Sequence, residues 1–341
     1  MSVPGAKNLI TDVAGLNVGH AMDEQVRSGV TVVAFCGAWT AGVDVRGGGP
    51  GTRETDALAP ENLVGSAHAM VLAGGSVFGL AAADGVAAAL SAGGIGLELR
   101  QGSPKVPIVP CAVLYDLANG GNKAWGDAPP YRELGMRALA AAHVDFAQGQ
   151  VGAGRGAMAG VLHGGIGSAS LDLGNGLLVG ALVALNSVGS VLMPDGRTFW
   201  AWPFELQREF GGQGPPREAM DASNPIPDES RLSDAGRLQA GLNTTLGVVA
   251  CNASLRSAEC KRIAMMAQDG IARAVRPAHT PYDGDTVFAV ASGARELASD
   301  ARRAVAIARI GSAAADCLAR AIARAAYAAN PALPPPRSAM A

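Results

Sequence analysis

Short runs of strand-forming residues alternate with longer helix-like stretches along the whole of this chain. A chain of this kind buries its apolar faces by packing helices against a sheet, so the alternation predicts a mixed α/β fold. The helix-like stretches are 77–90, 257–275 and 301–328, and Gly311 is a candidate break within the last of them. The strand-like runs are 31–35, 69–73, 177–186, 245–250 and 286–291.

The length of the chain allows one large domain, residues 1–341, or two ordinary ones, and its composition allows an extensive core. Hydrophobic residues make up 49% of the 341 residues and charged residues only 16%, and Ala and Gly dominate the apolar content. Small residues allow helices to pack closely on sheets and allow tight turns. The formal net charge is −2 and no basic block occurs, so neither nucleic acid nor an anionic membrane is an expected partner.

The cysteines and the start of the chain bear on its compartment. The five cysteines include no C-x-x-C pair and their number is odd, which predicts reduced, mostly buried thiols rather than disulfides. The start, MSVPGAKNLITDV, has no apolar signal core. The most membrane-like stretch, 70–90, is broken by glycines and by Asp84. We therefore expect a cytoplasmic protein.

The stretch 203–242 differs from the rest of the chain. It is rich in Gly, Pro, Asp, Glu and Ser and shows little periodicity. An irregular segment of this length within a compact domain is usually functional or disordered. We predict a mobile linker over 203–242, and the alternative is a surface insertion.

Three glycine clusters, at 46–56, 72–79 and 151–160, resemble phosphate-binding loops. None is followed by Gly-Lys-Ser/Thr, and none forms G-x-G-x-x-G between a strand and a helix with an acid downstream. Tight turns, or close approach of the backbone to a ligand or to another chain, explain these glycines better.

Other common catalytic centres lack their signatures. The five histidines (His20, His68, His143, His163 and His279) show no metal-ligand spacing, so no metal site is expected. No G-x-S-x-G elbow occurs, and Ser76, at a strand-to-helix turn, fits a helix cap better than a nucleophile. We expect no cofactor.

The junction Asn243-Thr244 lies where the irregular stretch ends and a strand-like run begins. If the bond before Thr244 were cut, its hydroxyl would lie beside its own α-amine, which places nucleophile and base in one residue. Downstream, Asp283-Gly284-Asp285 carries two carboxylates on one side of an extended chain, where both could hold that amine. The alternative is a turn with two solvated acids.

Taken together, eight segments resemble the DmpA-type aminopeptidases and the related β-aminopeptidases and nylon-oligomer (6-aminohexanoate oligomer) hydrolases. They occur in that family's order and span nearly the whole chain, so the joint signal is specific although each segment alone is not. The segments are 10–20, 44–58, 72–90, 106–117, 149–160, 180–189, 243–255 and 276–290.

The resemblance implies a four-layer αββα sandwich, like that of N-terminal-nucleophile hydrolases but with different connectivity. It also implies a precursor that cuts itself between Asn243 and Thr244. The resulting α subunit, 1–243, and β subunit, 244–341, would stay associated. Family members form homo-oligomers of processed units, often tetramers.

The same resemblance assigns the site residues. Thr244 corresponds to the nucleophile, and Asp283 and Asp285 match the acidic pair of the nylon-oligomer branch. Asn186 matches an asparagine that helps to stabilise the oxyanion, and Tyr115 matches a tyrosine near the nucleophile.

One departure concerns a lysine that commonly follows the GAGxGAxAG run in this family. Here Val161 and His163 occupy that region. His163 is the candidate substitute, but histidine is shorter than lysine and mostly neutral at pH 7.

The function that the resemblance implies is hydrolysis of small peptides, amino acid amides or ω-amino acid oligomers, without a cofactor. One alternative is an acyltransferase that uses the same threonine and passes the acyl group to an amine. A second is a binding homologue that is not processed. A nucleotide-binding enzyme fits the glycine clusters only.

Overall fold

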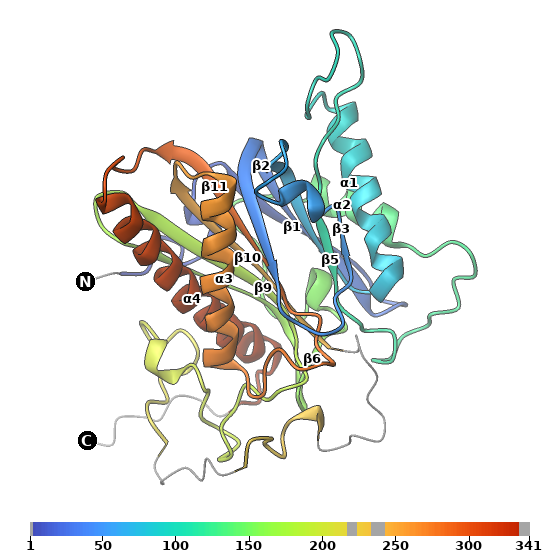
Figure 1. The fold of residues 1–341 in the computed structure, drawn as a ribbon. Coiled ribbons are helices and arrows are strands. Elements are labelled where there is room, and N and C mark those ends of the chain that lie inside the picture. Colours follow the sequence, from blue (N-terminus) through green and yellow to red (C-terminus); the bar gives the residue numbers. More distant parts are fainter. Residues whose placement is uncertain (1–2, 217–223, 233–242, 334–341) are drawn as a thin grey trace.

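The structure is a computed structural model that describes residues 3–216, 224–232 and 243–333 (Figure 1). Within these residues the main sheet has nine strands in the order β3-β5-β4-β2-β11-β10-β9-β8, with β1 paired to β2. Its strands are β1 (Leu16–Asp23), β2 (Ser28–Val45), β3 (Thr52–Arg53), β4 (Ser66–Ala73), β5 (Cys111–Val113), β8 (Gly165–Asp172), β9 (Leu178–Asn186), β10 (Thr244–Ala253) and β11 (Thr286–Arg295). A separate hairpin joins β6 (Met158–Ala159) to β7 (Leu162–His163).

Four α-helices accompany these strands in the described part of the chain. They are α1 (Ala81–Ala92), α2 (Tyr131–Ala140), α3 (Ser257–Ala274) and α4 (Arg302–Ala329). Short 3-10 helices are η1 (Ile10–Asp12), η2 (Asp56–Leu58), η3 (Ser76–Leu80), η4 (Gly152–Gly154) and η5 (Trp202–Phe204). No described helix combines the length and the apolar character that crossing a bilayer requires.

The long strand β2 turns this single sheet into two stacked layers. Its first half pairs with β1 and β4, and its last residues pair with β11, with an irregularity between Ala34 and Trp39. An apolar core fills the space between the layer of β1, β2 and β4 and the layer of β9 to β11. Helices α1 and α2 cover the outer face of one layer, and α3 and α4 cover that of the other (Figure 1). The predicted αββα sandwich is therefore confirmed.

The alternation of side chains along β9 explains why the strands are continuous apolar runs in the sequence. Val183 and Leu185 face α3 and α4, whereas Leu182 and Ala184 face the other layer of the sheet. Because successive side chains point to opposite faces and both faces are buried, every position is apolar. The strands and helices predicted from the sequence are all present, apart from shifts at their ends.

Helix α4 is continuous, so the candidate break at Gly311 does not occur. A Cβ at this position would lie 2.4 Å from the sulfur of Met266 on α3. Gly311 therefore permits close contact between the two helices rather than ending α4.

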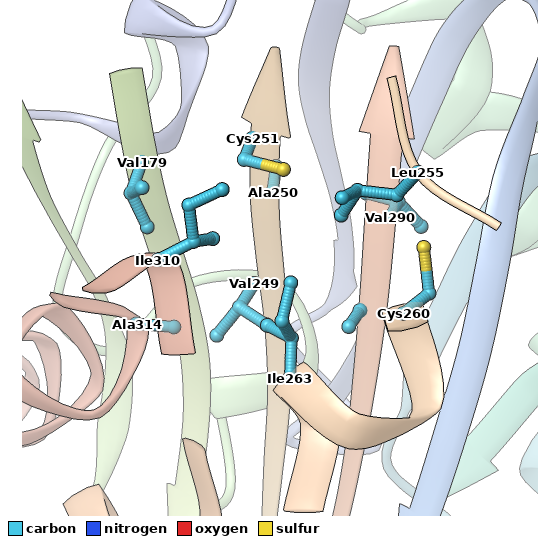
Figure 2. Close-up of a pocket in the computed structure, with 11 residues that line it drawn as sticks. Val179, Val249, Ala250, Cys251, Leu255, Cys260, Ile263, Val290, Ile310 and Ala314 are labelled. Carbon is cyan, nitrogen blue, oxygen red and sulfur yellow. The ribbon is translucent and has the colours of Figure 1, made fainter. Parts of the chain in front are cut away.

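Figure 2 shows the packing of α3 and α4 on β9 to β11, where Cys251 and Cys260 line a narrow apolar seam. The seam has no room for a water molecule. Burial raises the pKa of the Cys251 thiol to about 12, so this thiol is unreactive at neutral pH. All five cysteines are free and four are buried, which confirms the prediction.

The segment predicted as a mobile linker, 203–242, differs from that prediction in its described part. Phe210 is 1% exposed and packs edge-to-face on Phe199. Glu209 is buried against Arg320 of α4, with 2.6 Å between Oε1 and Nε. These contacts fix the early part of the segment to the core. Residues 217–223 and 233–242 lie outside the described residues.

Candidate active site

Strand β10 begins at Thr244 in the centre of the sheet, between β9 and β11. Thr244 pairs with Asn186 at the end of β9, and Asn243 forms a bridge with Asp283 just before β11. None of these four residues, nor Asp285, is more than 2% exposed. Three chain segments that are distant in sequence thus bring the predicted site residues together.

The carbonyl group of Asn243 is the focus of the site. Its oxygen accepts hydrogen bonds from the Thr244 hydroxyl at 2.5 Å and from the Gly284 backbone N–H at 2.8 Å. A Cβ on Gly284 would lie 2.7 Å from Thr244 Oγ1, so a larger residue would crowd the hydroxyl. A hydroxyl and a backbone N–H therefore meet at one carbonyl, an arrangement that is compatible with acyl transfer.

Asp283 is held by the turn that precedes it. Its Oδ2 accepts hydrogen bonds from the Thr280 backbone N–H at 2.9 Å and hydroxyl at 2.6 Å, and its Oδ1 accepts one from Val188 N–H at 3.3 Å. Burial, and then the nearby Asp285 carboxylate, raise the pKa of Asp283 to about 6. Asp283 therefore shares a buried site with a second acid.

Asp285 links the turn to the start of β10. Its Oδ1 accepts the Thr245 backbone N–H at 2.7 Å. Its Oδ2 accepts the backbone N–H of His279 at 3.1 Å and lies 2.8 Å from His279 Nδ1. The acids are buried and bonded, so the solvated-turn alternative is wrong.

The glycine cluster that follows β2 packs against this acidic turn. Gly49 N–H donates to the Asp283 carbonyl at 2.8 Å. A Cβ on Gly47 would lie 2.3 Å from the Asp283 carbonyl oxygen, and one on Gly48 would lie 2.7 Å from Pro281. The glycines therefore allow close approach of backbone to backbone, here within the same chain.

Asn186 ties two further segments to the site. Its Oδ1 accepts Met158 N–H at 2.9 Å, and its Nδ2 donates to the Tyr115 carbonyl at 3.1 Å. Tyr115 is thus joined to the site through its main chain.

The Gly284 N–H reaches the Asn243 carbonyl directly, and the sequence analysis had not identified Gly284 as a donor.

The region that carries a lysine in the resembled family supplies no buried cation. His163 and Val161 are exposed. The backbone of His163 is tied at both its N–H and its carbonyl to the side chain of Asn330, at the end of α4.

Arg231 is a cation at the junction that sequence reasoning missed. Its Nη1 donates to Asn243 Oδ1 at 2.7 Å. Burial lowers the pKa of this guanidinium from its usual high value. No sequence signal marked it, because it lies in the irregular stretch.

His279 was also missed, since the histidines were compared only with metal-ligand spacings. The useful signal was its place in the turn that leads to both acids. Within the described residues, no group of three His, Cys, Asp or Glu could hold a metal ion.

The sequence of this chain matches a known family and several known proteins. The model of peptidase family S58 matches residues 8–334. The chain is 45% identical over 330 residues to an uncharacterised aminopeptidase of Mycobacterium tuberculosis, and the match covers 92% of each protein. It is 31% identical over 312 residues to a 6-aminohexanoate-oligomer endohydrolase of Kocuria sp., covering 86% of this chain and 77% of that protein.

Two solved structures share the fold. A Burkholderia sp. β-aminopeptidase matches with a TM-score of 0.64 and 24% identity, covering 95% of this chain and 88% of the other. The L-aminopeptidase D-Ala-esterase/amidase of Ochrobactrum anthropi, described as a new variant among the Ntn hydrolase fold, matches with a TM-score of 0.65 and 20% identity, covering 96% and 88%. At these identities the likeness shows the fold alone.

Proposed function

This chain belongs to peptidase family S58, and from that premise we propose that it is a self-processing amide hydrolase whose nucleophile is the Thr244 hydroxyl. The family and its aminopeptidase relatives make it a hydrolase of peptide or other amide bonds. The observation that carries the finer proposal is the contact of Thr244 Oγ1 and Gly284 N–H with the same carbonyl oxygen, that of Asn243.

The first stage of the proposed mechanism is self-cleavage. Thr244 Oγ1 attacks the carbonyl carbon of Asn243, and the Gly284 N–H stabilises the oxyanion that forms. The hydroxyl proton passes to the leaving nitrogen, which becomes the α-amine of Thr244. Water then hydrolyses the ester and leaves a carboxylate on Asn243, so that 1–243 and 244–341 become separate, associated chains.

The second stage uses the new N-terminus as a catalyst. The Thr244 α-amine, with an ordinary pKa near 7.7–8.0, is a suitable base close to neutral pH. It takes the hydroxyl proton as the oxygen attacks the substrate amide, and it returns the proton to the leaving amine. Water then hydrolyses the ester between the acyl group and Thr244, which releases the acid and restores the hydroxyl. Asp285 fixes the start of β10 through Thr245, and backbone donors to the oxyanion contribute typically a few kcal/mol.

The proposed substrates are small peptides, amino acid amides or ω-amino acid oligomers. The aminopeptidase relatives favour an acyl group with a free amine, whereas the endohydrolase relatives cleave within 6-aminohexanoate oligomers. Matched p-nitroanilides of L-, D-, β- and ω-amino acids, each with a free or an acetylated amine, separate the two classes. An aminopeptidase should reject the acetylated member of each pair.

Denaturing mass spectrometry tests the nucleophile. The purified protein should appear as two chains that begin at residues 1 and 244. Thr244→Ala should give one intact chain of 34.2 kDa and no turnover. Ser76→Ala is the matched control, because it removes another hydroxyl at the end of a strand and should be cleaved normally. Amidase activity in Thr244→Ala would disprove the assignment.

The assembly of processed units is also a proposal. The resemblance favours a homo-oligomer, with a tetramer as the first expectation. Light scattering on the cleaved protein measures this directly, and a monomeric mass would contradict it.

A further inference from the structure

His279 lies at one corner of the acidic turn, between α3 and β11. Its imidazole Nδ1 and its own backbone N–H both contact Asp285 Oδ2, at 2.8 and 3.1 Å. A further hydrogen bond joins the imidazole to the backbone of Gln268 on α3. The side chain is 20% exposed and the backbone is left-handed, with φ of +56°. The residue is therefore held by three contacts, two of them through the ring, in a backbone conformation that few side chains adopt easily.

These contacts complete a chain of bonds that leads to the nucleophile. Asp285 Oδ2 faces His279, and Oδ1 accepts the N–H of Thr245 at 2.7 Å. Thr245 is covalently joined to Thr244. Because both oxygens are occupied, the carboxylate cannot rotate without breaking a bond, and the start of β10 is held in place.

The charges at this turn explain why a histidine matters here. Asp283 and Asp285 are both 1% exposed. If both were ionised and uncompensated, they would stabilise the α-ammonium of mature Thr244 and so remove the free base at neutral pH. A cation on the far side of Asp285 opposes that effect.

Other charged groups near the imidazole are weaker candidates for this role. Arg46, which follows β2, acts on His279 at longer range and lowers its pKa slightly. The Arg46 side chain is 37% exposed. It forms an ion pair with Asp44 at 2.9 Å and a longer one with Asp269 of α3 at 4.0 Å. Solvent and these acids screen Arg46, so His279 is the basic side chain in direct contact with Asp285.

We propose that His279 is a positioning residue for the Thr244 reaction: it orients Asp285, and its positive charge keeps the Thr244 α-amine available as a base near neutral pH. This inference rests on the proposed function.

The protonation of His279 agrees with this role. Burial alone lowers the pKa of the imidazole, but the hydrogen bond and charge of Asp285, together with the bond to the Gln268 backbone, outweigh it and raise the pKa above the ordinary value of 6.5. The imidazole therefore keeps its proton to a higher pH than an ordinary histidine does.

Two substitutions separate position from charge. His279→Asn keeps an N–H donor for Asp285 Oδ2 and tolerates a left-handed backbone, but it carries no charge. His279→Gly removes the side chain and also suits the backbone, so it avoids the strain that alanine would introduce.

The expected results concern the pH profile of kcat/KM on the cleaved enzymes. Loss of the positive charge raises the pKa of the Thr244 α-amine, so His279→Asn should move the acid limb upward by about one pH unit. Its rate on the alkaline plateau should stay within about threefold of the unsubstituted enzyme. His279→Gly should show the same shift and a plateau at least tenfold lower.

The outcomes distinguish this inference from the proposed function. If the unsubstituted protein stays uncleaved, or if Thr244→Ala is active, the proposed function fails. If those controls behave as expected but His279→Asn has an unchanged acid limb, the charge role is overturned. A wild-type plateau for His279→Gly overturns the positioning role. A folded His279→Gly that is not cleaved, beside a cleaved His279→Asn, supports it, because self-cleavage needs the same placement of Thr244.

Discussion

Two turns of this molecule bury a carboxylate beside glycine at the end of a strand. Asp116, after β5, accepts Gly75 N–H at 2.8 Å and is fully buried. Asp283, before β11, is 1% exposed. It precedes Gly284, whose backbone N–H donates to the Asn243 carbonyl. Burial is the largest cause of a raised pKa in both acids.

The difference between the turns lies in what surrounds the acid. Near Asp116 the hydroxyls of Tyr131 and Ser28 bond to each other at 3.0 Å. Near Asp283 the Thr244 hydroxyl contacts a carbonyl that also accepts a backbone N–H, and a second acid follows two residues later. A buried acid with a shifted pKa is therefore not enough to mark an active site, although such shifts are common there. The convergence of the Thr244 hydroxyl, a backbone donor and a pair of acids is what separates the two turns.

The largest expected difference is between Asp285→Asn and Asp116→Asn. Three N–H groups, two of His279 and one of Thr245, face the Asp285 carboxylate, and an Asn side chain accepts with only one oxygen. One N–H would then face an amide NH2, so we expect self-cleavage and turnover to fall at least 100-fold. The measurements are the cleavage rate by intact mass and kcat on the best p-nitroanilide.

Asp116→Asn should change both rates by less than about fivefold, since one amide oxygen is enough for Gly75 N–H. Equal losses in both variants would erase the distinction between the turns.

A second pair compares two glycines, Gly284→Ala and Gly74→Ala. Neither residue has a left-handed backbone, so alanine is compatible with both conformations. The methyl on residue 284 would lie 2.7 Å from Thr244 Oγ1, and we expect cleavage to slow about 30-fold as the hydroxyl is displaced.

The methyl on residue 74 would lie 2.3 Å from both Asp116 Oδ2 and Ser28 Oγ. This crowding should lower the free energy of unfolding by about 1–3 kcal/mol, while the folded protein keeps its cleavage rate. Urea unfolding and mass spectrometry of the same samples measure the two effects. Fast cleavage in Gly284→Ala would show that the contact does not constrain the nucleophile.

The smallest expected effect is a dependence of the free energy of unfolding on pH, to which both turns contribute. The pKa of Asp283 is raised to about 6 in the folded protein, so its stabilising proton is present at low pH and is lost as the pH rises through 6. Between about pH 4 and pH 6 this group should lower the free energy of unfolding by on the order of 1–2 kcal/mol.

Uncleaved Thr244→Ala is the background for this measurement, so that one chain unfolds. Because the pKa of each acid is raised, each should make the protein less stable as the pH rises. Adding Asp283→Asn or Asp116→Asn should therefore make the dependence of stability on pH less steep. A steeper dependence in Asp283→Asn would contradict the raised pKa.

The sequence predicted those site residues that lie in segments resembling a known family and missed others. Thr244, Asp283, Asp285 and Asn186 lie in segments that resemble a known family, and the structure brings all four together. Their chemical roles stay predictions. Arg231 lies outside those segments, in the irregular stretch, and carried no such signal. His279 lies within the segment 276–290, but the histidines were compared only with metal-ligand spacings.

By itself the sequence determined the strands and the helices, because periodic apolar residues specify which faces must be buried, and its resemblance to a known family implied the sandwich fold. It also determined the junction at Asn243-Thr244, where the irregular stretch meets a strand. Only the tertiary structure decided which backbone donor reaches the Asn243 carbonyl and which histidine contacts Asp285. Those contacts join segments that are distant in the chain, and their distances depend on how strands β9, β10 and β11 align.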